Sequence, residues 1–465
     1  MSASYSSERL FSSEAFCDLA NFVRSPRPRD ESLEDFERQL RERANAFSAA
    51  VMGERLAEMD VDEPQIKIGG EQFRRVGRHE KTYHTLSGEV VIERTIYVPS
   101  GGGRAIAPLD VRAGLVDARW TPLLARVMAR AVASTTPKEA AELFAEFGGA
   151  TPSTSSLDRL PKGVSEMWEA ARPGFETELR EKEEVPAEAV AVAVSLDGVL
   201  VPMKDGDRQK KRAQKDKLPK GPAGYREVGC GTVSFFDAEG NRVGTVRYAR
   251  MPERKKVTLK EELREELRSI FNVRPDLRLV LLADGAEDNW EFLDALAAEV
   301  GATEYYSAVD LFHVLEHIKK ACDAYYGEGS PDSKSWFEQA RVWLREFDDG
   351  AERVIRSLRY RRDRSTGTKR KTITAQIRYM EKRRHQMRYY SLLEKNLPVG
   401  SGVVEAACKT LASERMKRSG MSWMNEGGQA ILTLRSLIQS DRFDRAWKRI
   451  TSFYKLPVEL VGVAA

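Results

Sequence analysis

The sequence predicts a mixed α/β protein in which an α/β core follows a largely helical N-terminal part. Three observations support this prediction. Residues 30 to 59 carry apolar side chains at helical spacing and contain no Pro or Gly before Gly53. From residue 187 onward, apolar runs typical of strands alternate with amphipathic helical segments. From about Leu311 to Asn396 the chain has helical character and is rich in basic residues.

Length and composition limit the class of protein. A chain of 465 residues is too long for one compact core, so about two to four domains are expected. The composition, 41% hydrophobic and 31% charged, is that of a soluble globular protein. The sequence has no apolar run of about 18 residues and its N-terminus does not resemble a signal peptide, which predicts a cytoplasmic protein without a membrane partner. Four widely spaced cysteines form no C-x-x-C pair, which favours free thiols over a disulfide scaffold or a zinc ribbon.

Two regions are expected within residues 1–110. Residues 1–62 form an N-terminal helical region. Residues 63–110 alternate in polarity on both sides of Ser87-Gly88, which predicts a β-hairpin, and SGGGR then reads as a loop.

Residues 111–186 are expected to form a helical DNA-binding region with a candidate helix-turn-helix at 137 to 160. Pro137 stands at a helix start, Gly148-Gly149 break the helix, and a second helix rich in Ser and Thr follows. Such a second helix can enter a major groove. A plain helical hairpin fits this outline equally well.

The core is predicted from the order of its elements. A strand, two strands around the turn Glu239-Gly240-Asn241, a helix, a strand, a helix and a short strand follow one another. This is the order of the ribonuclease H-like fold, in which the first strand lies beside the fourth. The expected core comprises residues 187–310 plus 397–440, with an all-helical basic insertion at 311–396 and a C-terminal tail at 441–465.

Charge is concentrated in two segments although the net charge is only +4. Between Arg353 and Arg388, fourteen basic and two acidic residues give a local balance of +12. Residues 204 to 220 hold eight basic and three acidic residues. Two such runs favour a polyanionic partner, nucleic acid first, over two merely solvated faces.

Three carboxylates are candidates for a metal site. Asp197 is expected to end the first strand and Asp284 the fourth, so both belong to one sheet edge, and Glu405 follows on a later helix. Carboxylate oxygens suit Mg²⁺, and two such ions can promote attack on a phosphodiester. Each residue has an alternative explanation: Asp197-Gly198 as a hairpin turn, Asp284 with Glu287 as a capping box, and Glu405 as a partner of a helix dipole.

A zinc metalloprotease is a remote alternative. Residues 313 to 317 read HVLEH, the inverted zincin motif, and place His313 and His317 on one helical face. A five-residue pattern arises easily by chance, and the sequence shows no partner motif downstream.

The motifs SLDGV, LLADGAEDNW, VDLFHVLEHI and LPVGSGVVEAACKTLASERMKRSGMSW together resemble those of DDE transposases from bacterial insertion sequences. The similarity is to the Kra-type group, which is related to Mutator-like transposases, and it covers residues 60 to 445. It implies a ribonuclease H-like catalytic core with a helical insertion before the Glu, which fits the 121 positions from Asp284 to Glu405. By this resemblance Asp197, Asp284 and Glu405 are the catalytic triad that binds Mg²⁺, with Mn²⁺ as a substitute.

The resemblance also implies a supporting pair and one departure. Asp310 and His313 match a C/D-x-x-H motif that contacts the DNA backbone or supports the site; the alternative is an N-cap and a packing residue. The group's Cys-based zinc ribbon is missing from YVPSGGGRA, so no structural zinc is expected, the hairpin is a degenerate version, and its role in DNA contact is open.

The function expected from these features is a transposase that binds the terminal inverted repeats of its insertion sequence. It would cleave and join DNA strands by metal-dependent hydrolysis and transesterification, act on target DNA as a homo-oligomer, and be nucleoid-associated when on DNA. The basic side chains expected at the DNA are Lys204, Lys210, Lys211, Arg212, Arg361, Arg362, Arg383, Arg384, Lys409, Arg415, Lys417 and Arg418. The alternatives are a ribonuclease H-like nuclease without strand transfer and a non-catalytic DNA-binding protein derived from a transposase.

Overall fold

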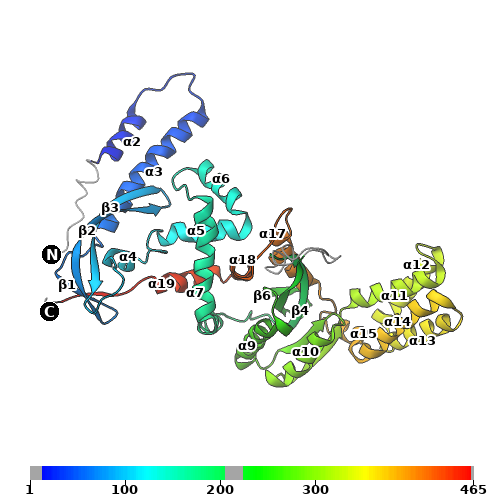
Figure 1. Cartoon of the computed structure of the whole chain (residues 1–465). Coiled ribbons are helices and arrows are strands. Elements are labelled where there is room, and N and C mark those ends of the chain that lie inside the picture. Colours follow the sequence, from blue (N-terminus) through cyan, green and yellow to red (C-terminus); the bar gives the residue numbers. More distant parts are fainter. Residues whose placement is uncertain (1–12, 205–223, 462–465) are drawn as a thin grey trace, which may run out of the picture. The chain divides into compact units, whose positions relative to one another are not determined.

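The protein divides into two compact units in the computed structural model, which describes residues 13–204 and 224–461 (Figure 1). The first unit comprises Met1–Phe175 and Arg442–Ala465, and the second comprises Glu176–Asp441. The basic residues Lys210, Lys211 and Arg212 lie outside the described residues.

The elements of the first unit are mainly helical, with a small sheet. They are α2 (Glu14–Arg24), α3 (Leu33–Ala57), β1 (Gln65–Ile68), β2 (Glu71–Thr85), β3 (Gly88–Pro99), α4 (Pro108–Arg112), α5 (Pro122–Ser134), α6 (Pro137–Phe147), most of α7 (Thr154–Glu181), α19 (Phe443–Phe453) and β9 (Val458–Leu460).

The sheet of the first unit is antiparallel, with strand order β3-β2-β1-β9. The predicted hairpin is confirmed, because Thr85 pairs with Gly88 across a turn of two residues. Within the expected C-terminal tail, 441–465, α19 is a helix and β9 pairs with β1, with Ile66 opposite Leu460. A short strand can complete a sheet edge without any strong signal in the sequence.

The hairpin is tied to α4 by a buried carboxylate. The side chain of Asp110 accepts hydrogen bonds from Tyr83 Oη (2.6 Å) and Arg94 Nη1 (2.6 Å), both on the hairpin strands. Lys81 Nζ lies 3.4 Å from the same carboxylate. A hydrogen-bonded ion pair therefore joins hairpin and helix at this point.

The helix-turn-helix outline is present as α6 and α7. A capping box between Thr136 and Glu139 starts α6, with Pro137 in its first turn. Gly148 and Gly149 then adopt positive φ values of 70° and 87°, which favour glycine and end the helix. The two helices and their break are confirmed, whereas their role at DNA stays a prediction.

The elements of the second unit follow the predicted order. They are β4 (Ala191–Pro202), β5 (Tyr225–Phe236), β6 (Arg242–Arg250), α9 (Val257–Val273), β7 (Arg278–Ala283), α10 (Glu287–Glu299), β8 (Tyr305–Val309), α11 (Leu311–Tyr326), α12 (Pro331–Glu346), α13 (Gly350–Asp363), α14 (Gly367–Arg383), α15 (Tyr389–Leu393), α16 (Gly402–Ala407), a π-helical segment η3 (Cys408–Ser413), α17 (Glu414–Met416) and α18 (Asn425–Gln439).

The second unit contains a five-stranded mixed sheet with strand order β6-β5-β4-β7-β8. The first three strands are antiparallel neighbours, and β7 and β8 are parallel to β4. The expectation that the first strand lies beside the fourth is confirmed, because β4 pairs with β7 from Ala191 to Ser195.

Helices cover both faces of this sheet. Leu259 and Leu263 of α9 pack against β5, where Gly229 and Gly231 leave no room for a Cβ. Val404 of α16 joins a second buried cluster on the other face, formed with β4, β5, η3 and α18. The sheet is therefore enclosed on two sides, as strands with near-continuous apolar sequences require.

The expected helical insertion is present as α11 to α15, between β8 and α16. Its helices pack on one another through buried residues such as Val314, Leu344 and Ile377. In the described part of the chain, no helix is both long enough and apolar enough to cross a membrane.

Candidate active site

Asp197 lies inside β4 rather than at its end. It pairs with Cys230 of β5, and the pairing continues through Gly198 to Pro202. The hairpin-turn explanation for Asp197-Gly198 is therefore wrong, and so is the expectation that Asp197 ends the strand. The pairing of β4 with β7 does end earlier, at Ser195, so Asp197 lies at the edge where the parallel strands stop.

Asp284 follows β7 directly and is held by local hydrogen bonds. Its Oδ1 accepts from the backbone N–H of Ala286 (3.1 Å) and from Asn289 Nδ2 (3.3 Å). Asn289 Nδ2 is also 3.5 Å from the carbonyl oxygen of Leu196, the residue before Asp197. The capping-box explanation is wrong, because the N-cap of α10 is Ala286 and makes no side-chain cap bond.

The two aspartates act on each other electrostatically. Burial raises the pKa of Asp197, and the neighbouring charge of Asp284 raises this pKa further. The backbone N–H of Gly198 and the charge of Lys256 lower it, but by less. Two carboxylates that repel each other in a half-buried place are stabilised by a cation. This is what a metal site of oxygen ligands requires.

Glu405 lies in the first turn of α16, where a helix dipole also favours an acid. Its helix packs against β4, and Cys408, three residues later, points its thiol at Asp197 Oδ2 at 3.8 Å. The helix becomes a π-helix at Cys408, a distortion that is frequent at functional sites. The backbone therefore brings Glu405 to the side of the sheet on which Asp197 lies.

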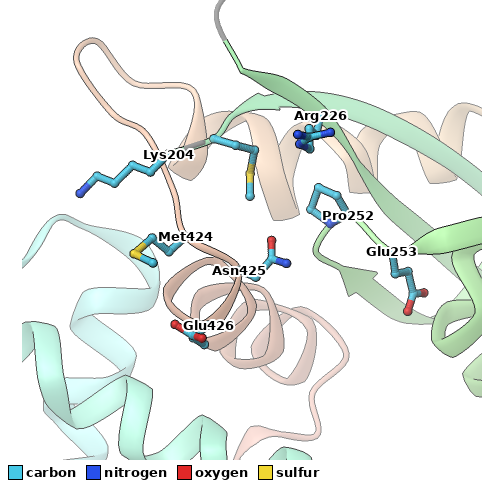
Figure 2. Close-up of a pocket in the computed structure, with 8 residues that line it drawn as sticks. Lys204, Arg226, Pro252, Glu253, Met424, Asn425 and Glu426 are labelled. Carbon is cyan, nitrogen blue, oxygen red and sulfur yellow. The ribbon is translucent and has the colours of Figure 1, made fainter. Parts of the chain in front are cut away.

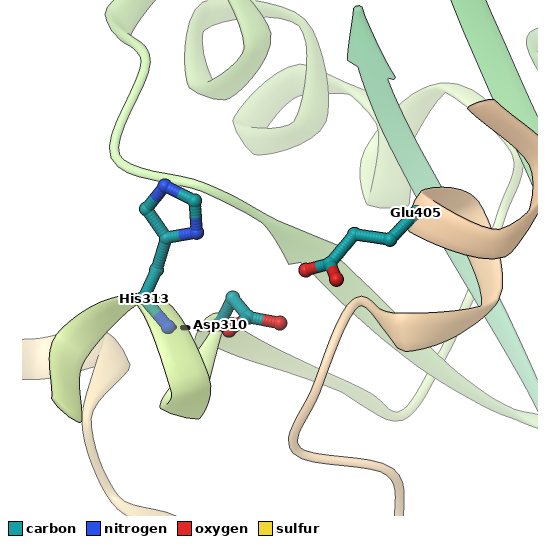
Figure 3. A group of neighbouring side chains, drawn as sticks. All are labelled: Asp310, His313 and Glu405. Carbon is teal, nitrogen blue, oxygen red and sulfur yellow. Dashed lines mark hydrogen bonds between the residues drawn. The ribbon is translucent and has the colours of Figure 1, made fainter. Parts of the chain in front are cut away.

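The side chain of Glu405 meets Asp310 and His313 (Figure 3). One ligand atom from each of the three lies within 4.8 Å of the others. Among the residues that the structure describes, this is the one such group of three, and Asp197 and Asp284 are not in it. The predicted triad therefore does not meet as one group of three: the charge of Asp284 acts on Asp197, and Glu405 lies with Asp310 and His313.

A hydroxyl that the sequence analysis missed joins these carboxylates. Ser401 Oγ lies 2.6 Å from Asp310 Oδ2 and 3.2 Å from Glu405 Oε1, and the Ser401 backbone N–H also donates to Asp310. Asp310 in turn donates its own backbone N–H to the carbonyl of Ala283 (2.9 Å), one residue before Asp284. The only sequence signal for Ser401 was its place just before a helix.

Asp310 is also the N-cap of α11, as its alternative explanation proposed, because it accepts from the backbone N–H of His313 (2.7 Å). His317, the second histidine of the HVLEH motif, lies elsewhere. Its Nδ1 is 2.5 Å from Gln376 Oε1, and its ring stacks on Tyr379 at 3.7 Å. Since His317 is not part of the group that could hold a metal, the described residues do not support the zincin explanation.

Tyr379 is a further residue near the site that the sequence did not single out. Its ring occupies the space beside Gly285, where a Cβ would overlap it. Burial raises the pKa of Tyr379, and the charges of Asp284 and Asp310 raise it further. Its enclosed hydroxyl has no hydrogen-bond partner among the described residues.

The basic residues expected at DNA differ in exposure. Exposed side chains are Lys204, Arg384, Lys409, Lys417 and Arg418. Arg361 and Arg362 are half-buried, and the guanidinium group of Arg361 donates hydrogen bonds to the hydroxyls of Tyr326 and Ser357.

Arg383 and Arg415 do not lie on the surface as expected. They are 7% and 2% exposed, and their guanidinium groups lie over the rings of Trp290 and Trp423. Trp423 lies at the end of β4, where its backbone N–H donates to the carbonyl of Pro202 (2.9 Å). Aromatic rings can bury an arginine that its sequence context would expose.

A separate pocket of about 630 Å³ lies where β4, β5 and α18 meet (Figure 2). Its lining mixes two basic side chains, Lys204 and Arg226, with two acidic ones, Glu253 and Glu426. The residues that line it do not include any of the four carboxylates described above. The pocket is therefore distinct from the candidate active site.

No protein-family model matches the chain, and no curated protein matches it by sequence. Among solved structures, the chain is similar to one described as the Drosophila P element transposase strand transfer complex. The TM-score is 0.27 and the sequence identity 13%, over 71% of this chain and 81% of that chain. A similarity of this size does not assign a fold or a family, so the Kra-type resemblance stays a prediction.

Proposed function

We propose that the chain is a DDE-type transposase with a ribonuclease H-like catalytic core in its second unit. The proposal rests on the position of Asp197 and Asp284, which both lie where the parallel strands β4 and β7 stop pairing. The helix that carries Glu405 packs against β4. The order of the sheet, β6-β5-β4-β7-β8, is consistent with this core.

The donor atoms fit Mg²⁺, with Mn²⁺ as a substitute. Asp197, Asp284 and Glu405 offer oxygen ligands only, and the mutual repulsion of the two aspartates is relieved by a cation. When bound, the ions would activate the attacking oxygen and stabilise the leaving oxygen of a phosphodiester. Asp310 is not assigned to these ions, and its oxygens accept hydrogen bonds from the backbone N–H of His313 and from the backbone N–H and hydroxyl of Ser401. It holds Ser401, and through Ser401 it orients Glu405.

The DNA-binding part of the proposal assigns binding to basic surface and to the first unit. Lys409, Lys417 and Arg418 are exposed and follow Glu405 closely in the chain, and we assign them to contacts with backbone phosphates. Terminal inverted repeats would be recognised by the first unit, with α6 and α7 as the first candidates. Two ends must be held together for strand transfer, so the active form is proposed to be a homo-oligomer that also binds target DNA.

The test is an assay with a labelled duplex that carries the element's end, read from the DNA flanking the gene, in the presence of Mg²⁺. Wild type should cleave the end, and a pre-cut 3′ end should be joined to a target duplex. Asp284→Asn should bind the same duplex and cleave it at least about a hundredfold more slowly. Cleavage without any joined product would favour the nuclease, and equal behaviour of wild type and Asp284→Asn would favour a non-catalytic DNA-binding protein.

A further inference from the structure

Three side chains with different ligand atoms meet at the start of α11. Asp310 precedes the helix, His313 lies in its first turn, and Glu405 comes from α16. Figure 3 shows the carboxylates of Asp310 and Glu405 turned toward each other, with the His313 ring beside the same space. Imidazole and two carboxylates within 4.8 Å form a mixed nitrogen and oxygen donor set.

One member of this group, Asp310, is fixed before any ligand arrives. Asp310 is fully buried, and its backbone N–H is fixed on the carbonyl of Ala283 at 2.9 Å. Ser401 Oγ has one proton to donate, yet it lies within hydrogen-bond distance of both Asp310 (2.6 Å) and Glu405 (3.2 Å). The hydroxyl of Ser401 therefore lies between the two carboxylates, and the buried Asp310 gives the group one fixed ligand.

The group also retains free ligand capacity. A carboxylate has about four lone-pair sites, and Asp310 uses three of them for His313 N–H, Ser401 N–H and Ser401 Oγ. Glu405 is exposed, and Ser401 Oγ is the donor that reaches it among the described residues. His313 is half-buried.

We propose that Asp310, His313 and Glu405 bind one divalent transition-metal ion, with Mn²⁺ preferred over Mg²⁺. Imidazole is a ligand for first-row transition metals, whereas Mg²⁺ prefers oxygen and gives up its waters reluctantly. This inference rests on the proposed function and deepens it. The proposed metal site shares Glu405 with the candidate active site, and the inference states which metal binds beside Glu405. The tie between Asp310 and Ala283 places this ion next to the Asp197 and Asp284 pair.

The test measures metal binding to the full chain in the absence of DNA. Calorimetric titration, or the loss of the free Mn²⁺ signal in electron paramagnetic resonance, gives the affinity for Mn²⁺ and, by competition, for Mg²⁺. His313→Ala should weaken Mn²⁺ binding at least about tenfold and should reduce the preference for Mn²⁺ over Mg²⁺. His317→Ala is the matched control: it removes an imidazole one turn later on the same helix, outside the group, and should leave both affinities unchanged.

Glu405→Gln provides a second variant at an exposed position, and it should weaken the same Mn²⁺ site. Asp197→Asn should leave that site in place. If His313→Ala and Glu405→Gln bind Mn²⁺ as tightly as wild type, or if His317→Ala has the larger effect, the inference is overturned. If wild type cleaves no DNA but His313→Ala loses Mn²⁺ binding, the inference stands and the proposed function is rejected. If wild type cleaves DNA but His313→Ala binds Mn²⁺ as tightly as wild type, the proposed function stands and the inference is rejected.

Discussion

Asp197 and Asp284 occupy equivalent positions beyond the point where two parallel neighbouring strands stop pairing. Each lies two residues beyond the last cross-strand pair, Ser195 opposite Leu282, that joins β4 to β7. Both carboxylates therefore lie at the same edge of the sheet, Asp197 inside β4 and Asp284 directly after β7. Their mutual charge effect, which contributes to the raised pKa of Asp197, agrees with this placement.

Removing one charge from this pair should stabilise the metal-free protein. The raised pKa of Asp197 means that folding weakens the stability of its ionised form relative to the unfolded state. Asp197→Asn should therefore raise Tm by about 2–4 °C, the shift that about 1 kcal/mol produces in a domain of roughly this size. Asp294→Asn, an exposed position on α10, should leave Tm unchanged.

Mg²⁺ should reverse this order of stability, as measured by thermal unfolding at several pH values. It should raise Tm of wild type more than that of Asp197→Asn, because an ion that binds only the folded state stabilises it. The increase should shrink as pH falls through the raised pKa of Asp197, since protons then compete with the ion. A destabilised Asp197→Asn protein in metal-free buffer would argue against the pair as a metal site.

Ser401→Ala should separate positioning of Glu405 from binding of DNA. The change removes the hydroxyl that bridges Asp310 and Glu405 and leaves the backbone N–H bond to Asp310 intact. We expect a loss of about 1 kcal/mol in stability and a fall in cleavage of about 10–100-fold, with DNA affinity unchanged. Ser419→Ala, on the exposed segment after Glu405, is the control and should cleave as wild type does. A parallel loss of DNA affinity in Ser401→Ala would point to a general structural role.

Asp110→Asn should destabilise the first unit. The substitution keeps the shape of the side chain but leaves Arg94 without its buried counter-charge. Breaking such a pair costs about 3–5 kcal/mol, which denaturant unfolding measures. Asp117→Asn, whose side chain is 75% exposed, should leave the free energy of unfolding almost unchanged.

A chelator should not affect the hairpin, because side-chain contacts tie it to α4. Unfolding of the hairpin by a chelator would contradict this account.

Gly285→Ala should disturb the site through Tyr379. A Cβ at this position would overlap the Tyr379 ring, which is held by its stack on His317. We expect a loss of about 1–3 kcal/mol from overpacking and a fall in cleavage, because Gly285 directly follows Asp284. Gly402→Ala is the matched control, since its Cβ would meet open space within α16. Equal Tm values for the two variants would show that Tyr379 is free to move aside.

Much of the fold could be predicted because its signals are local. The hairpin around Ser87-Gly88 and the helix break at Gly148-Gly149 follow from alternation and from glycine. The neighbouring positions of β4 and β7 follow from the order of elements. What escaped prediction is where pairing changes partner: β4 leaves β7 after Ser195 but continues along β5, so Asp197 lies inside a strand.

The candidate site was predicted only in part because it depends on how distant segments meet. Nothing near Glu405 in the sequence indicates that Ser401 bridges it to Asp310, 95 positions earlier than Glu405. Arg415 was expected on the surface because it lies in a basic run, yet Trp423 folds back over it. Burial of a charged side chain under an aromatic ring is decided by tertiary packing.

The central claim is tested most directly by comparing wild type with Glu405→Gln on the labelled element end, with Mg²⁺ for cleavage and without it for binding. The substitution preserves the size of an exposed side chain and removes its charge. The account predicts equal DNA affinity and a loss of cleavage of at least about a hundredfold. Equal cleavage by the two proteins would contradict it.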